Sequence, residues 1–375
     1  MNLIFIMMDG ARVDRIEKGK NYCDLVNESA FFSKTITFAP YTIAALHAVF
    51  SGTYGHKNGV NSYWSSPKFK NDEYKSLSLY LQENGYYTHA DVINNLVLPK
   101  IGFDKFVVHD EINDNLTERH KELLKTMKSK SLENNNFFLY LHYSNIHTGI
   151  MEEVLKKYDN FSTEYFSQKE KNEKFYDNLF DKADNYLGEI ISYCKKLELL
   201  EDSLIVVISD HGISLGEKIG ERAYGVFCYD YTLISTALFH HHSIPKISIN
   251  KQVRSVDILP TILELLSIPI DKFYKKIDGI SLVPLINGEP YDERIAFSQS
   301  GNPLNNKQPP KEPNIFSLRT NKWKFINNIY NDSEELYDLE NDPKEEKNII
   351  DSNKIVADEL RIKLKEILDE RTKIE

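Results

Sequence analysis

An apolar, β-branched run at Leu204–Ser209 is followed directly by Asp210, His211 and Gly212. Such a run predicts a buried strand, and ligands collect at the carboxyl ends of strands in open α/β sheets. A neighbouring carboxylate and imidazole can supply an oxygen and a nitrogen to one divalent cation. This strand end therefore favours folds in which a buried sheet presents polar groups along one edge.

A second apolar run, Asn2–Met8, ends in the same way, in Asp9 and Gly10. Two strand ends of this kind predict a metal centre in which Asp9, Asp210 and His211 are ligands. Carboxylate and imidazole ligands suit Mn²⁺ or Zn²⁺, and they do not exclude Mg²⁺ or Ca²⁺.

Strand-like runs alternate with helical patterns along most of the chain. The expected strands are Asn2–Met8, Tyr86–Val92, Phe137–Tyr143, Leu204–Ser209 and Leu233–Phe239, and the expected helices are Ile43–Phe50, Tyr74–Glu83, Glu118–Lys130, Lys171–Leu199 and Ser255–Leu266. This alternation predicts an α/β fold with a large, mostly parallel central sheet flanked by helices on both faces.

The pattern changes after Gly288. Short, polar-interrupted runs at Ile295–Ser298, Ile315–Arg319 and Lys324–Asn328 precede a charged helix at Ile355–Glu370. We predict a catalytic α/β domain at residues 1–288, and a small antiparallel-sheet-plus-helix subdomain at 289–375 packed on it. The loop Gly301–Pro313, rich in Asn, Pro and Lys, is expected to be mobile.

The amino-acid composition limits the classes of binding partner and the cellular compartment that we expect for this protein. A net charge of -10 leaves no basic surplus to neutralise phosphates, which argues against a nucleic-acid partner. The three cysteines lack a CxxC pattern and suit a reducing compartment. Because no run approaches the roughly 20 apolar residues of a membrane helix, we expect a cytoplasmic protein without membrane insertion. The oligomeric state stays open.

Thr42 opens a short helical pattern after a break at Pro40, and Gly52 ends it. At or near a helix N-cap, its hydroxyl can simply accept a backbone N–H. It can also act as a nucleophile, because the helix dipole and a nearby cation both favour the alkoxide. Both interpretations stay open on sequence alone.

The order of these motifs resembles the sulfatase family of the alkaline phosphatase superfamily, over nearly the whole chain. The matching segments are Asp9–Arg12, Ala39–Gly52, Phe137–His147, Tyr176–Gly188, Leu204–Glu217, Val253–Thr261, Asp278–Leu282 and Glu335–Pro343. The resemblance implies an alkaline-phosphatase-like fold, metal ligands at Asp9, Thr42, Asp210 and His211, and a substrate-binding histidine at His147.

The departures from the family pattern concern the nucleophile. Sulfatases oxidise a Cys or Ser in a Cys-x-Pro-Ser-Arg element to formylglycine, whereas this chain has Thr42, Ala44 and Leu46 at the nucleophile, Pro and Arg positions. An oxidised Thr would be a ketone, not an aldehyde, and Gly10 replaces the second Asp of the usual pair. These features are similar to superfamily branches that use a Thr nucleophile on phosphodiesters. No convincing extra Asp/His set is found, so one metal ion is expected.

The predicted activity is a metal-dependent hydrolase or phosphoryl-group transferase for a small-molecule or glycan phosphoester. Thr42 would attack in line and form a covalent phospho-threonine, and His147 would bind the phosphoryl group or protonate the leaving group. A sulfuric ester hydrolase is the second reading. A catalytically inactive scaffold that binds a glycan or a protein is the third.

Several other residues receive weaker predictions. Arg12 and Lys218 are candidate substrate contacts, although an ion pair is the plainer reading of Arg12. His142 is expected in the core. The roles of His47, His56 and Glu217 stay open, His240–His242 is not expected to be a site, and Asp257 and Asp278 are expected to be structural.

Overall fold

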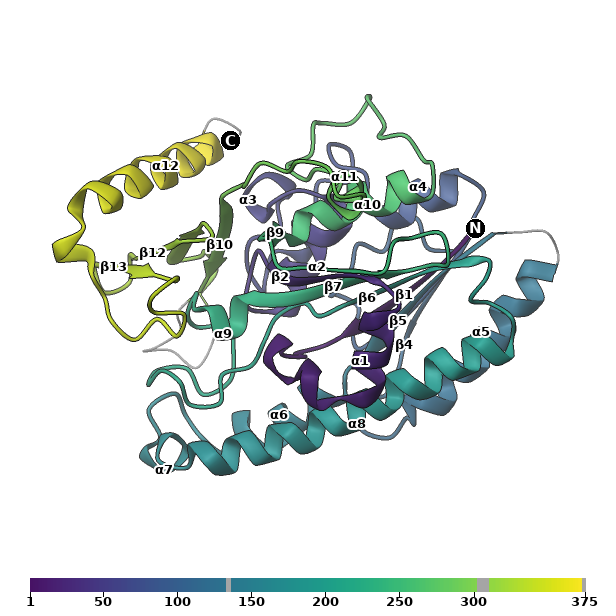
Figure 1. The fold of residues 1–375 in the computed structure, drawn as a ribbon, viewed down its shortest axis with the longest axis horizontal. Helices are drawn as coiled ribbons and strands as arrows, with labels where there is room; N and C mark the ends of the chain where they lie inside the picture. Colours follow the sequence, from purple (N-terminus) through teal and green to yellow (C-terminus); the bar gives the residue numbers. More distant parts are fainter. Residues whose placement is uncertain (133–135, 302–309, 373–375) are drawn as a thin grey trace.

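A computed structural model describes residues 1–132, 136–301 and 310–372, and it confirms the expected α/β class (Figure 1). The strands of the large sheet are β1 (Asn2–Met8), β2 (Ala30–Ile36), β3 (Tyr87–Val92), β4 (Lys105–Val108), β5 (Phe137–Tyr143), β6 (Ser203–Ile208), β7 (Ile234–His240), β8 (Ile247–Ile249) and β9 (Val253–Arg254). Eight of these nine strands follow the order β4-β3-β5-β1-β6-β7-β2-β8, and the ninth, β9, pairs with β2.

The sheet is mostly parallel, as the sequence predicts. Strand β1 lies between β5 and β6 and runs parallel to both. Strand β7 is the exception, because it runs antiparallel to β6 and to β2. Antiparallel neighbours need no crossover helix, and residues 209–233, which connect β6 to β7, form a loop that ends in the four-residue helix α9 (Asp230–Leu233).

Strand β1 shows why the apolar runs are continuous instead of alternating. Leu3, Phe5 and Met7 pack into the hydrophobic cluster on one face of the sheet. The even-numbered residues Ile4, Ile6 and Met8 pack into the cluster on the other face. Successive side chains point to opposite faces, so a strand that is buried on both sides must be apolar at every position.

Helices cover both faces of the sheet (Figure 1). On one face lie α2 (Thr42–Ser51), α4 (Leu77–Glu83), α10 (Ile258–Leu265) and α11 (Val283–Ile286). On the other lie α1 (Lys20–Asn27), α5 (Leu116–Leu132), α6 (Asn145–Ile150) and α8 (Lys169–Lys196). The short helices α3 (Gly55–Asn58) and α7 (Thr163–Phe166) lie in connecting segments.

The C-terminal part is a separate antiparallel sheet with one helix, as predicted. Its strands β10 (Ala296–Ser300), β11 (Ile315–Arg319), β12 (Trp323–Asn328) and β13 (Ser333–Asp338) pair in sequence order. Helix α12 (Lys354–Thr372) packs its apolar side chains against this sheet. The domain boundary at residue 288 stays a prediction, and residues 302–309 of the expected mobile loop lie outside the described residues.

Within the described ranges, every helix is too short or too polar to cross a bilayer.

Candidate active site

The carboxyl ends of β1 and β6 bring three potential ligands together. Asp9 follows β1, and Asp210 and His211 follow β6, its parallel neighbour. One ligand atom from each lies within 4.8 Å of the other two, and all three residues are buried. Parallel neighbouring strands end at the same edge of a sheet, so this convergence follows from the topology.

Three atoms in this group have no hydrogen-bond partner among the described residues: Asp9 Oδ1, Asp210 Oδ2 and His211 Nε2. His211 Nε2 lies 3.4 Å from Asp210 Oδ2 and 3.9 Å from Asp9 Oδ1. Buried polar atoms are nearly always paired, so unpartnered atoms that face one another mark a place for a ligand. Two carboxylate oxygens and one imidazole nitrogen are a donor set that fits a divalent cation.

The two carboxylates differ in their electrostatic surroundings. Burial raises the pKa of Asp9, but the interactions with His147, His142 and His211 together outweigh this effect. The pKa of Asp9 therefore falls to about 2. Burial and the neighbouring charge of Asp9 raise the pKa of Asp210. Asp9 is therefore the anionic centre of the site, and a cation would relieve its repulsion with Asp210.

Thr42 reaches this centre from α2. It is the first helical residue, and its hydroxyl does not cap the helix because Tyr41 takes the N-cap position. Thr42 Oγ1 lies 3.5 Å from Asp9 Oδ2. Thr42, a 92% buried residue at a helix N-terminus, thus points its hydroxyl at the candidate ligand Asp9, and the capping interpretation does not apply.

His147 lies on the first turn of α6 and approaches the Asp9 carboxylate. Its Nδ1 lies 3.7 Å from Asp9 Oδ1. Its side chain remains 18% exposed, whereas Asp9 is 1% exposed. His147 is thus a partly exposed side chain next to the buried Asp9 carboxylate.

Tyr224 and His142 are two site residues that the sequence analysis did not assign. Tyr224 Oη hydrogen bonds to His147 Nδ1 at 3.2 Å, and its ring centroid lies 4.8 Å from that of His211. Burial raises the pKa of the Tyr224 phenol, so it remains a hydrogen-bond donor. His142, fully buried as expected for a core residue, donates from Nε2 to Asp9 Oδ2 at 3.1 Å.

The two predicted substrate contacts, Arg12 and Lys218, form ion pairs and hydrogen bonds with other residues of the fold. Arg12 Nη1 donates to Glu217 Oε1 at 2.7 Å, and Arg12 Nη2 pairs with Asp14 at 2.8 Å. Lys218 Nζ donates to the Glu345 carbonyl and lies 4.9 Å from the ring centroid of Tyr229. Both side chains line a cavity of about 380 Å³, and their role with substrate stays a prediction.

The remaining candidates have partners within the fold. His47 Nδ1 lies 2.7 Å from the Ile43 carbonyl, and burial lowers its pKa to about 4. The ring of His56 packs against Phe297, with 5.4 Å between centroids. Asp257 and Asp278 accept backbone N–H bonds from Arg254 and Tyr54. These observations suit structural roles.

The fold is that of the alkaline-phosphatase-like superfamily, and the three converging side chains are candidate ligands for a divalent cation at its sheet edge. The sequence model described as "Sulfatase" matches residues 1–268, and one described as "N-sulphoglucosamine sulphohydrolase, C-terminal" matches residues 221–373. The chain belongs to the sulfatase family, whose members generally bind a divalent metal.

Two curated relatives show how far the sequence likeness extends. Choline-sulfatase of Rhizobium meliloti (strain 1021) is 28% identical over 199 residues, which cover 52% of this chain and 36% of that protein. Arylsulfatase K of Bos taurus is 31% identical over 232 residues, which cover 56% of this chain and 40% of that protein. The chain thus matches well under two thirds of the length of these relatives.

Solved structures extend the likeness over the whole fold. A protein solved in complex with its substrate D-glucosamine-2-N,6-O-disulfate has a TM-score of 0.73 and 18% identity, covering 100% of this chain and 97% of that one. The phosphonate monoester hydrolase of Silicibacter pomeroyi has a TM-score of 0.74 and 16% identity, covering 100% and 96%. At these identities the likeness shows the fold alone.

Proposed function

We propose that the protein hydrolyses a sulfuric acid ester of a small molecule or a glycan at the Asp9–Asp210–His211 centre. The observation that carries ester hydrolysis at this centre is the Thr42 hydroxyl, 3.5 Å from a carboxylate whose other oxygen has no partner among the described residues, and it does not choose between sulfate and phosphate. The named relatives, a choline-sulfatase and arylsulfatases K, support the sulfate class. This preference reverses the order expected from the sequence, which placed phosphoesters first.

Asp9, Asp210, His211 and Thr42 would hold the cation, which supplies charge to polarise the ester and to favour the ionised Thr42 hydroxyl. Thr42 Oγ1 attacks the sulfur and releases its proton to a solvent water, so one O–S bond forms and the bond between the sulfur and the leaving oxygen breaks. His147, hydrogen bonded to Tyr224, protonates the leaving oxygen. Water then attacks the sulfur, and sulfate leaves with the Thr42 hydroxyl restored.

A phosphodiester is the second candidate substrate, and Thr42 itself favours it. Because oxidised Thr is a ketone, the hydrated-aldehyde route of sulfatases is closed to this chain, and direct attack by a hydroxyl remains. A phosphonate monoester hydrolase has the same fold. The covalent intermediate would then be phospho-threonine, resolved by water or by an acceptor alcohol.

Parallel kinetics on aryl sulfate, aryl phosphonate and bis-aryl phosphodiester substrates, with added Mn²⁺ or Zn²⁺, separate the two. Sulfate turnover with the highest kcat/KM is the expected result, and faster phosphodiester turnover would favour the second candidate. No turnover together with no bound metal would favour a binding scaffold.

Thr42→Ala tests the nucleophile in the same assays. Since the variant lacks the attacking oxygen, kcat should fall by about 10³-fold or more, while Asp9, Asp210 and His211 still bind metal. Thr42→Ser keeps the hydroxyl and is the matched control. Wild-type turnover in the alanine variant would refute the role of Thr42.

A further inference from the structure

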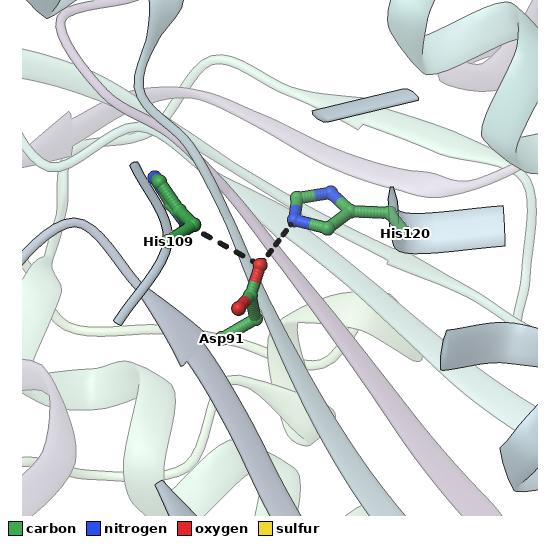
Figure 2. A group of neighbouring side chains, drawn as sticks. All are labelled: Asp91, His109 and His120. Carbon is green, nitrogen blue, oxygen red and sulfur yellow. Dashed lines mark hydrogen bonds and ion pairs between the residues drawn. The ribbon is translucent and has the colours of Figure 1, made fainter. Parts of the chain in front are cut away.

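Figure 2 shows a second Asp–His group, whose strand β3 is separated from β1 by the single strand β5. Asp91 is at the end of β3, His109 follows β4, and His120 lies on α5. Asp91 Oδ2 lies 3.3 Å from His109 Nδ1 and 3.0 Å from His120 Nε2, and all three side chains are fully buried. In composition and spacing the group resembles a metal site.

Its hydrogen bonding distinguishes it from the first group. Arg119 Nε and Nη2 donate to the Asp91 carboxylate at 2.8–3.0 Å, so a cation already balances the charge. The imidazole nitrogens that face away from Asp91 also have partners. His120 Nδ1 is hydrogen bonded to Tyr186 Oη at 2.6 Å, and His109 Nε2 is hydrogen bonded to Ser144 Oγ at 3.1 Å. Thus no ring nitrogen or carboxylate oxygen of this group is left without a partner, in contrast to the Asp9 centre.

The ionised state of Asp91 agrees with a network in which every donor and acceptor has a partner. Burial raises the pKa of Asp91, but hydrogen bonds from His109, His120 and Arg119 hold it well below its usual range. A neutral imidazole has one donor and one acceptor nitrogen. Each histidine that donates to Asp91 therefore accepts a hydroxyl proton on its other side, from Ser144 or from Tyr186.

The Ser144 end of this network leads back to the active site. Ser144 follows β5 and is the N-cap residue of α6, but its hydroxyl does not cap the helix. Its carbonyl accepts the Thr148 N–H at 2.9 Å, which closes the turn that contains His147. The backbone orientation of Ser144 therefore affects the orientation of the first turn of α6. Because His147 lies on that turn, the position of its imidazole depends on Ser144 as well.

We propose that Asp91, His109 and Ser144 form a metal-free positioning network that holds His147 against the Asp9 centre. The role rests on the proposed function, because His147 acts there on the leaving group. Arg119 and His120 fix the Asp91 carboxylate, Asp91 orients the His109 ring, and His109 binds the hydroxyl at the helix start.

Ser144→Ala removes one hydroxyl from the network and tests the proposal. A small displacement of a catalytic group costs about 10- to 100-fold in rate, so we expect kcat to fall by that factor with KM changed less than about threefold. Tyr186→Phe is the matched control. It removes a hydroxyl from the far end of the same network, keeps the ring stacked on Tyr143, and should change kcat less than about threefold.

A double-mutant cycle with His147→Asn separates positioning from general damage. If Ser144 acts through His147, Ser144→Ala should have almost no further effect on kcat in the His147→Asn background. Multiplicative losses in the double variant, or equal losses for Ser144→Ala and Tyr186→Phe, would overturn the proposal.

Two readouts do not depend on turnover. In crystal structures, Ser144→Ala should move the His147 ring away from Asp9 and Tyr186→Phe should not; an unmoved ring in Ser144→Ala would overturn the proposal. Metal analysis of the purified protein should give one equivalent that survives Asp91→Asn, and a second equivalent lost in that variant would show a metal at Asp91 instead. If wild type turns over no ester while the ring moves as expected, the proposed function fails and the positioning stands.

Discussion

Glu221 is a buried carboxylic acid in the loop that carries Tyr224. Its Oε1 accepts the backbone N–H groups of Val226 and Phe227 at 2.8 and 2.9 Å. Burial raises its pKa from 4.5 to about 7, against the lowering effect of these hydrogen bonds. The folded protein therefore holds a proton on Glu221 in a range where the unfolded chain has lost it.

Stability should fall with rising pH because of this group. Below pH 4.5 both states are protonated, between about 4.5 and 7 only the unfolded state ionises, and above 7 the full penalty applies. Glu221→Gln removes the penalty, which is worth at most about 3 kcal/mol. We expect the variant to be more stable than wild type in urea unfolding at pH 8 and equal to it at about pH 4, below the unfolded-state pKa of 4.5. Equal curves at pH 8 would refute the raised pKa.

The sequence predicted the candidate ligands that directly follow long apolar runs, whereas Thr42 came from a helix start and His147 from the family resemblance. Asp9, Asp210 and His211 stand directly after strands, so strand order brings them together. Tyr224 lies in a loop whose path depends on tertiary contacts, and no local pattern signals it. His142 is part of an apolar strand, so its burial was expected, but its bond to Asp9 depends on the pairing of β5 with β1.

Gly52 ends helix α2 and shows how this element is held in place. Its backbone φ of +62° is a left-handed conformation that favours glycine. A Cβ at this position would lie 3.1 Å from side-chain atoms of Ile277 and Leu259. The end of the helix that begins at Thr42 therefore fits only glycine without strain.

Gly52→Ala should destabilise the protein by about 1–3 kcal/mol, from left-handed strain and from crowding. Gly85→Ala is the control, since Gly85 also has a positive φ, +81°, but a Cβ there meets nothing within 4 Å. Its loss should be limited to about 1–2 kcal/mol. Chemical unfolding of both variants measures the difference, and a Gly52 variant no less stable than the Gly85 variant would contradict the packing argument.

Elements with long apolar runs were predicted most closely, and several short or mixed ones were missed, although the short strands β10, β11 and β12 were predicted. Strands β1, β5 and β6 lie within one residue of their expected ends. Strand β2 was missed, because its apolar start changes to Ser33-Lys34-Thr35 where the pairing with β7 shifts register. Strand β13 (Ser333–Asp338) has only two apolar residues, and its pairing with β12 supplies what its own pattern does not indicate.

The two sheets of the molecule are joined by a buried ion cluster. Asp230, the first residue of α9, accepts bonds from Arg319 Nη2 on β11 and Lys324 Nζ on β12, each at 2.8 Å. The backbone N–H of Asp230 donates to Glu345 Oε2 at 2.7 Å. Burial raises the pKa of Asp230, but Lys324 and Arg319 lower it further, so it remains ionised.

Asp230→Ala should destabilise the whole molecule by about 3–5 kcal/mol, since it leaves Arg319 and Lys324 buried without their partner. Lys322→Ala breaks the exposed pair with Glu340 and should cost about 0–1 kcal/mol. Thermal and urea unfolding of both variants measure the difference. A loss below about 1 kcal/mol for the Asp230 variant would show that the cluster does not couple the sheets.

The position of β1 between β5 and β6 determines when the candidate active site can form during folding. The hydrogen bond between His142 and Asp9 spans 133 positions of the chain, and the one between Gly10 and Asp210 spans 200. Closing such long loops is slow, so the centre forms only when the middle of the sheet is complete. Catalytic competence should therefore appear late during refolding, after most helical signal has returned, which makes activity a sensitive indicator of correct strand assembly.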